Sequence, residues 1–90
     1  LKGFSSKKLL LILTEKEDDI INYVIHDLNR GITSLFAEGE YTHHKKKMLY
    51  CIVTTRQMVE LKTAIHQIDP SAFITIVDAS EVRGKGFATI

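Results

Sequence analysis

The 90-residue sequence lacks the residues that define a disulfide scaffold or a membrane span. Its only cysteine, Cys51, has no partner, so no internal disulfide forms and nothing requires an oxidising compartment. The longest apolar run, Leu9–Leu13, is far shorter than the roughly 20 residues needed to cross a bilayer. No small-residue cleavage site follows this run, which makes it a poor signal peptide. The segment is therefore predicted to be soluble.

Neither sign of charge is in large surplus. The chain has 12 Lys and Arg residues against 11 Asp and Glu, a net charge of +1, which gives no general attraction to nucleic acid or anionic membranes. Its 44% hydrophobic and 26% charged residues are typical of a globular domain. We predict one domain over residues 1–90, with its core in residues 6–87. Because the chain begins with Leu1 rather than Met, it is predicted to be a fragment of a longer protein.

Hydrophobic periodicity predicts four strands and two helices. Lys8–Thr14 is apolar on both alternating faces, as in a central strand that is buried on two sides. The first helix is predicted to begin with a capping box of Thr14 and Glu17 and to end where Gly31 takes the left-handed position. Its apolar stripe consists of Ile20, Ile21, Val24, Ile25 and Leu28.

The rest of the chain reads as a hairpin, a helix and a last strand. Only residues 42–46 separate the two hairpin strands, so these are predicted to pair in antiparallel fashion. The helix has a second capping box and stops before a proline. In order, these elements are strand Ile32–Tyr41, strand Lys47–Thr54, a helix that Thr54 and Gln57 cap and Pro70 ends, and strand Ala72–Val77.

The predicted order, β-α-β-β-α-β, is an α+β arrangement of the ferredoxin-like type, a four-stranded antiparallel sheet with two helices on one face. The first and third strands lie centrally in that fold, and here both are apolar on both faces. The chain is too short to supply a further element for the other face. Self-association through this open face is therefore predicted.

The predicted hairpin tip carries two histidines and three lysines, His43–Lys47. His43 and His44 point to opposite sides of an extended chain, and neither has a cysteine or carboxylate at ligand spacing, so no metal site is predicted. The lysines are typical of a solvated tip that discourages edge pairing. Contact with a phosphate on a neighbouring subunit is the alternative.

A second basic stretch, Arg83–Phe87, reads RGKGF. Gly84 and Gly86 admit close backbone approach while Arg83 and Lys85 add positive charge, so an anion could be held there. An ordinary turn is the alternative, since the nucleotide fingerprints need a following helix that is not evident here.

No nucleophile and base form a recognisable constellation, so the chain is predicted not to be an enzyme, with no catalytic residue and no cofactor. RNA-recognition domains share this element order but place stacking aromatics on the first and third strands. The first strand here has none, so nucleic-acid binding is not predicted. Cys51 is predicted to be a buried, inert thiol.

Four stretches in this order resemble one family: NRGIT (29–33), GEYT (39–42), IDPSAFITIVDASEV (68–82) and GKGF (84–87). The chain resembles, from about residue 3 to residue 87, the C-terminal soluble domain of YitT-type bacterial membrane proteins. The resemblance lies in the ordered set rather than in one motif. Ala37 and His43 stand where the family pattern has glycine, and Gln57 stands where a glutamate is usual.

The resemblance implies membrane-spanning helices upstream, with this domain on the cytoplasmic side of the bacterial plasma membrane. It also implies a PII-like fold. PII proteins commonly form trimers and bind adenine nucleotides or other small effectors between subunits. PII proteins have a long loop between the second and third strands. The corresponding connection here is only a few residues, which argues against the same signalling mechanism. If a ligand binds, the contacts expected are Arg30, Gly31, Thr33, Gly39, Tyr41, Arg83, Gly84, Lys85 and Gly86.

The leading hypothesis is a cytoplasmic regulatory domain that senses a small anionic ligand, such as a nucleotide, for an attached membrane domain. The expected assembly is a homo-oligomer, with a trimer as one form. Two alternatives stay open. The first is a purely structural oligomerisation domain, and the second is an ACT-like domain that binds a free amino acid at a subunit boundary.

Overall fold

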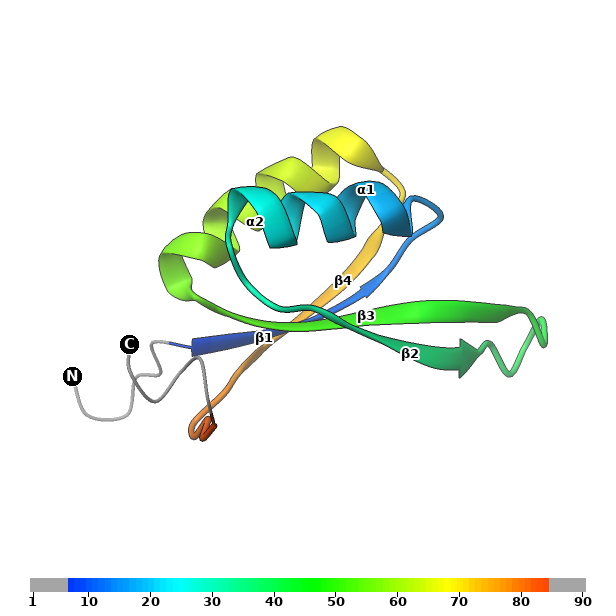
Figure 1. Ribbon diagram of the computed structural model, residues 1–90. Helices are drawn as coiled ribbons and strands as arrows, with labels where there is room; N and C mark the ends of the chain where they lie inside the picture. Colours follow the sequence, from blue (N-terminus) through cyan, green and yellow to red (C-terminus); the bar gives the residue numbers. More distant parts are fainter. Residues whose placement is uncertain (1–6, 85–90) are drawn as a thin grey trace.

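The computed structural model describes residues 7–84 of the chain. Its strands are β1 (Lys7–Leu13), β2 (Thr33–Glu38), β3 (Lys45–Thr54) and β4 (Phe73–Asp78). They pair in antiparallel fashion in the order β2-β3-β1-β4. Figure 1 shows both helices on one face of this sheet, so the predicted ferredoxin-like α+β fold is confirmed. The helical elements are α1 (Glu17–Asn22) and the π-helical segment η1 (Tyr23–Asp27), both between β1 and β2, and α2 (Thr55–Ile68), between β3 and β4.

The core lies between the sheet and the helices. Alternate residues of the two central strands face the helices, because successive strand side chains point to opposite sides. Ile25, which the sequence placed in the apolar stripe of the first helix, is 44% exposed and lies outside this core. Full burial stabilises by about 1.5–3 kcal/mol for each large aliphatic side chain. Within residues 7–84, the side chains with no exposure are Leu10, Ile12, Ile20, Val24, Leu49, Val53 and Leu61.

The predicted capping box at the start of α1 is wrong, whereas the one at the start of α2 is confirmed. The Thr14 hydroxyl is buried and donates to Oδ2 of Asp69 at 2.6 Å, and the N-cap of α1 is Lys16, without a side-chain cap. At α2, Thr54 and Gln57 make both bonds of the box, at 2.9 and 3.2 Å. The Thr14 oxygen also accepts from the N–H of Lys16 at 3.0 Å, so Thr14 orders the connection before α1 instead of capping the helix.

The left-handed residue that ends the first helical segment is Asn29, not Gly31 as predicted. Asn29 has a φ of 55°, and the next N–H, that of Arg30, bonds to the carbonyl of Val24 at 3.0 Å. Asparagine tolerates this conformation better than most residues. A Cβ at Gly31 would meet nothing within 4 Å, so that position does not require glycine.

Strands β2 and β3 extend past the rest of the sheet as a hairpin arm, defined here as residues 36–47. β1 ends opposite Met48, so Lys45–Lys47 pair only with β2. Figure 1 shows the arm projecting beyond both helices. The strands differ from their predicted bounds, because β2 stops at Glu38 and β3 already begins at Lys45. The turn closes with the N–H of Gly39 bonded to the carbonyl of His44 at 3.0 Å.

Candidate functional site

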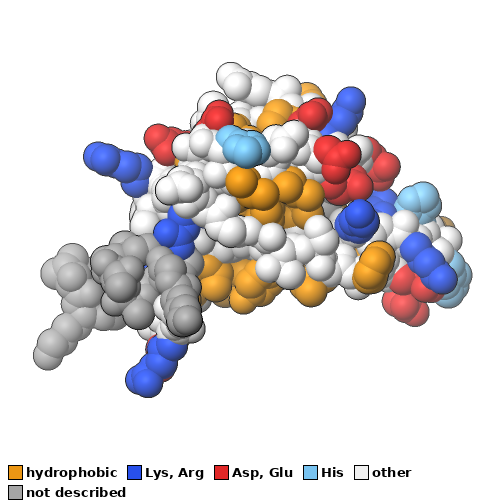
Figure 2. Space-filling model, in the orientation of Figure 1, with side chains coloured by type: hydrophobic (Ala, Val, Ile, Leu, Met, Phe, Trp, Pro, Cys, Tyr) orange, Lys and Arg blue, Asp and Glu red, His pale blue; other side chains and the backbone are white. Residues whose placement is uncertain are grey.

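The sheet face opposite the helices is apolar. Its centre is formed by cross-strand pairs such as Leu11 with Tyr50 and Leu9 with Ile52, all of them half-buried. At its borders Phe73 is 67% exposed. Figure 2 shows hydrophobic side chains along the lower border of the molecule, beneath the sheet. Residues 7–84 supply no layer for this face, and an apolar surface of this kind is typical of an interface.

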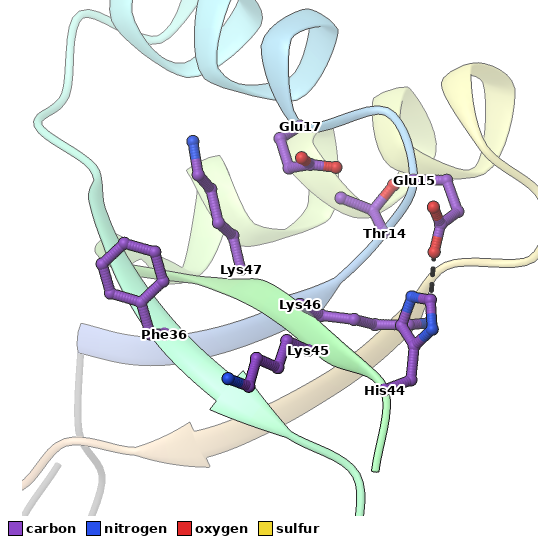
Figure 3. Close-up of a pocket in the computed structure, with 8 residues that line it drawn as sticks. All are labelled: Thr14, Glu15, Glu17, Phe36, His44, Lys45, Lys46 and Lys47. Atoms are coloured by element: carbon purple, nitrogen blue, oxygen red, sulfur yellow. Dashed lines mark ion pairs between the residues drawn. The ribbon is translucent and has the colours of Figure 1, made fainter. Parts of the chain in front are cut away.

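A hollow of about 340 Å³ lies on the other side of the sheet, between the start of α1 and the hairpin arm. Figure 3 shows that its walls come from two parts of the chain, the connection after β1 and the arm. The first wall carries carboxylates and the second carries lysines and an aromatic ring. The lining residues are Thr14, Glu15, Glu17, Phe36, His44, Lys45, Lys46 and Lys47.

The strand register explains how the arm presents these groups. Phe36 is paired with Lys47 across β2 and β3, and their side chains lie next to each other in Figure 3. Lys45, two residues from Lys47, has the same strand parity. The Phe36 ring is 92% exposed, which is unusual for so large an apolar side chain. The arm therefore offers an apolar surface with two cations.

Two of the charges at the hollow are already compensated. Lys46 Nζ lies 3.2 Å from Oε2 of Glu15, and this ion pair joins the two walls (Figure 3). Nothing within salt-bridge distance in residues 7–84 compensates Glu17, Lys45 or Lys47. The hollow therefore combines one uncompensated carboxylate with two uncompensated ammonium groups.

The part of the chain that the structure describes has no arrangement of side chains suited to metal binding or to catalysis by a thiol. Residues 7–84 contain no group of three or more His, Cys, Asp or Glu side chains that could hold an ion. Cys51 is buried, as predicted, and burial raises the pKa of its thiol to about 11. A thiol that stays protonated at neutral pH is a poor nucleophile.

Within residues 7–84 no helix is long and apolar enough to cross a membrane.

The ligand-binding residues predicted from the sequence fall at three separate places in one chain. Lys85 and Gly86 lie outside the described residues. β2 and β4 are opposite edges of the sheet, and Figure 1 shows the arm tip and the segment after β4 at opposite ends of the molecule. The three places are the connection into β2 with Arg30, Gly31 and Thr33, the tip with Gly39 and Tyr41, and the segment after β4 with Arg83 and Gly84.

Residues 30–84 match the family described as "Uncharacterized protein conserved in bacteria (DUF2179)". The chain belongs to the DUF2179 family. This domain is 40% identical over 85 residues to the UPF0750 membrane protein YvjA of Bacillus subtilis (strain 168), covering 94% of the chain and 30% of YvjA. It is 31% identical over 78 residues to the UPF0750 membrane protein YitT of the same organism, covering 87% of the chain and 28% of YitT. The resemblance to YitT-type proteins is confirmed, and the domain spans less than a third of either relative.

Solved structures agree with this assignment. The DUF2179 protein from Eubacterium ventriosum superposes with a TM-score of 0.69 at 22% identity, over 79% of this chain and 97% of that one. Arabidopsis thaliana PII bound to citrate superposes with a TM-score of 0.72 at 16% identity, over 97% of this chain and 87% of that one. The predicted PII-like fold of the DUF2179 domain is thereby confirmed. At these identities the likeness concerns the fold alone.

The sequence did not single out Phe36 or Glu17 of the DUF2179 domain as site residues. Strand alternation alone could have placed Phe36 beside the lysines of the next strand, since hairpin partners share a face. The position of Glu17 across the hollow has no signal in the sequence, because it depends on how α1 packs over the sheet. Lys45, Lys46 and Lys47, which the sequence predicted to form a solvated hairpin tip, also line the hollow.

Proposed function

We propose that this DUF2179 domain is a self-associating regulatory module that responds to a small anionic ligand on behalf of an attached membrane domain. The observation that carries the proposal is the open apolar face of the sheet. A second copy is its simplest cover, since identical faces can pack about a symmetry axis. The names and greater lengths of YvjA and YitT support an attached membrane domain. We place the module on the cytoplasmic side of the bacterial plasma membrane.

Assembly would also give the predicted ligand-binding residues a common location. In one chain the groups around Arg30 and Arg83 belong to opposite edges of the sheet. In a closed ring of copies, one edge of a subunit lies near a different edge of its neighbour. The arginines and Lys85 would then meet the negative charge of a ligand at the boundary, and the glycines would admit it to the backbone.

Light scattering on the isolated chain tests the assembly. We expect a homo-oligomer, with a trimer as one form, that dissociates when Ile52→Asp places a charge at the centre of the open face. Val59→Asp is the matched control, because Val59 is an exposed apolar residue on α2, on the helix side. Circular dichroism shows that each variant is folded. A wild-type chain that stays monomeric at high micromolar concentration would contradict the proposal.

Calorimetric titration with nucleotides and dinucleotides tests the ligand. We expect binding that Arg83→Ala and Lys85→Ala weaken, while Arg56→Ala on the outer side of α2 leaves it unchanged. No heat from any anionic ligand, together with an intact oligomer, would favour the purely structural alternative. In that case the Arg83 and Lys85 variants would behave as the wild type.

A further inference from the structure

We infer that the hollow between α1 and the hairpin arm binds a free α-amino acid with an acidic side chain. The ligand would have one ammonium group and two carboxylates. This site is distinct from the residues around Arg30 and Arg83, and all of its walls come from a single chain. The inference therefore does not depend on self-association.

The opposite charges of the two walls point to a zwitterion. Glu17 stands at the start of α1, and Lys45 and Lys47 stand on the arm across the hollow, as Figure 3 shows. A ligand with phosphate groups alone would meet the lysines but would also face Glu17 without compensation. A polyamine would have the reverse problem. Only a ligand that carries both signs compensates both walls.

The count of uncompensated charges selects an acidic amino acid over a neutral one. The ion pair of Lys46 with Glu15 removes one charge of each sign. Glu17 then contributes −1 and the remaining lysines of the arm contribute +2, a balance of +1. An amino acid with a second carboxylate carries −1 overall and complements this balance.

The Phe36 ring gives the ligand an apolar contact. It lies beside Lys47 on the arm and is 92% exposed. The methylene carbons of an acidic side chain can pack on the ring face while the carboxylates reach the lysines on either side. An ammonium group near the ring face would gain a cation–π attraction as well.

The acidic wall is held in place before any ligand arrives. Asp69 Oδ2 accepts hydrogen bonds from the Thr14 hydroxyl at 2.6 Å and from the N–H of Glu15 at 3.3 Å. These bonds fix the connection that leads into α1, and a fixed wall lowers the ordering cost of binding. The volume of about 340 Å³ is near the lower end of the usual range of small-molecule sites, which suits a ligand of about ten non-hydrogen atoms.

Titration of the isotopically labelled chain by two-dimensional NMR tests the inference. The probes are L-glutamate, glutarate, which lacks the ammonium group, and 4-aminobutyrate, which lacks the α-carboxylate. We expect L-glutamate to bind most tightly and to shift the amide signals of Phe36, Lys47 and Glu17. Because each contact is an exposed ion pair, loss of one should weaken binding up to about fivefold. Added salt should weaken it further.

Two variants test which group of the ligand each wall of the hollow contacts. Glu17→Gln should remove the advantage of L-glutamate over glutarate, and Lys47→Ala should remove its advantage over 4-aminobutyrate. Glu60→Gln and Lys62→Ala are matched controls on the exposed side of α2 and should change neither ratio.

The inference is overturned if glutarate binds the wild type as tightly as L-glutamate, or if millimolar L-glutamate shifts no signal at the hollow. It is equally overturned if the α2 controls act like the variants of the hollow, or if a nucleotide shifts the same signals at lower concentration. The light-scattering measurement on Ile52→Asp is independent of this titration, so each proposal fails on its own result.

Discussion

The hydroxyl of Thr14 donates a 2.6 Å hydrogen bond to Oδ2 of Asp69, which joins the end of β1 to the end of α2 across 55 residues of sequence. Oδ1 of Asp69 accepts from the N–H of Ser71 at 3.0 Å, so the same carboxylate also shapes the turn into β4. One side chain thus ties together the two connections at this end of the molecule, that from β1 to α1 and that from α2 to β4. It holds the acidic wall of the hollow, while the Thr14 oxygen accepts from the N–H of Lys16 at 3.0 Å rather than from an N–H in the first turn of α1.

Thr14→Val should destabilise the domain, because it keeps the shape of the side chain and removes a buried hydroxyl. We expect a loss of about 1–2 kcal/mol in the free energy of unfolding, measured by urea denaturation. Thr63→Val is the control, since the exposed Thr63 hydroxyl bonds only to the Val59 carbonyl of its own helix. Equal losses in the free energy of unfolding of Thr14→Val and Thr63→Val would show that the hydrogen bond to Asp69 does not stabilise the domain more than the exposed one.

The stability of the domain should depend on Asp69 in acid. The hydrogen bond from Thr14 is the main cause that holds the pKa of Asp69 below its ordinary value of 3.8. A folded-state pKa below the unfolded one stabilises the fold above the unfolded value, and this contribution is lost as pH falls through the folded pKa. We therefore expect stability to fall from about pH 4 downward.

Urea denaturation at pH 6 and pH 3 checks this. Asp69→Asn should be less stable than the wild type at pH 6, and the difference should shrink at pH 3. Asp18→Asn, an exposed change in α1, is the control. A gap between Asp69→Asn and the wild type that is as wide at pH 3 as at pH 6 would refute the linkage.

Cys51 should react with thiol reagents only when the core opens. Its side chain is 2% exposed, and burial raises its pKa to about 11, so little thiolate is present at pH 8. We expect slow labelling by a disulfide reagent in buffer and fast labelling in urea. Ser80→Cys, on the exposed segment after β4, gives the rate of an accessible thiol. Labelling of both thiols at one rate in buffer would rule out the buried position.

The helix stop at Asn29 can be separated from Gly31 by substitution. Asn29→Val should cost about 1–2 kcal/mol, because a β-branched residue resists the left-handed conformation at φ 55°. Gly31→Ala should change stability by less than about 0.5 kcal/mol, since the added Cβ meets nothing within 4 Å. Thermal denaturation of both variants measures the difference. A larger loss of stability in Gly31→Ala than in Asn29→Val would show that Gly31 ends the helix, as the sequence predicted.

The elements and their order follow from local signals in the sequence. Two-sided apolar patterns marked β1 and β3, which are the central strands of the sheet. The capping box of Thr54 and Gln57 marked the start of α2 because both of its bonds lie within four residues. Signals that lie within a few neighbouring residues do not depend on the rest of the fold. Their consistency is what made the ferredoxin-like arrangement predictable.

The choices that failed involved partners far away along the chain. Thr14 had the spacing of a capping residue, but its buried hydroxyl donates to the distant Asp69 carboxylate at 2.6 Å and accepts from Lys16 N–H ahead of α1. The place of Glu17 opposite Lys47 likewise depends on how the helix layer lies over the arm. The sequence alone determined which segments are strands and helices and which faces are apolar, because those properties repeat along a few neighbouring residues. Only the tertiary structure decided which distant side chains meet, because packing brings together groups that no local pattern relates.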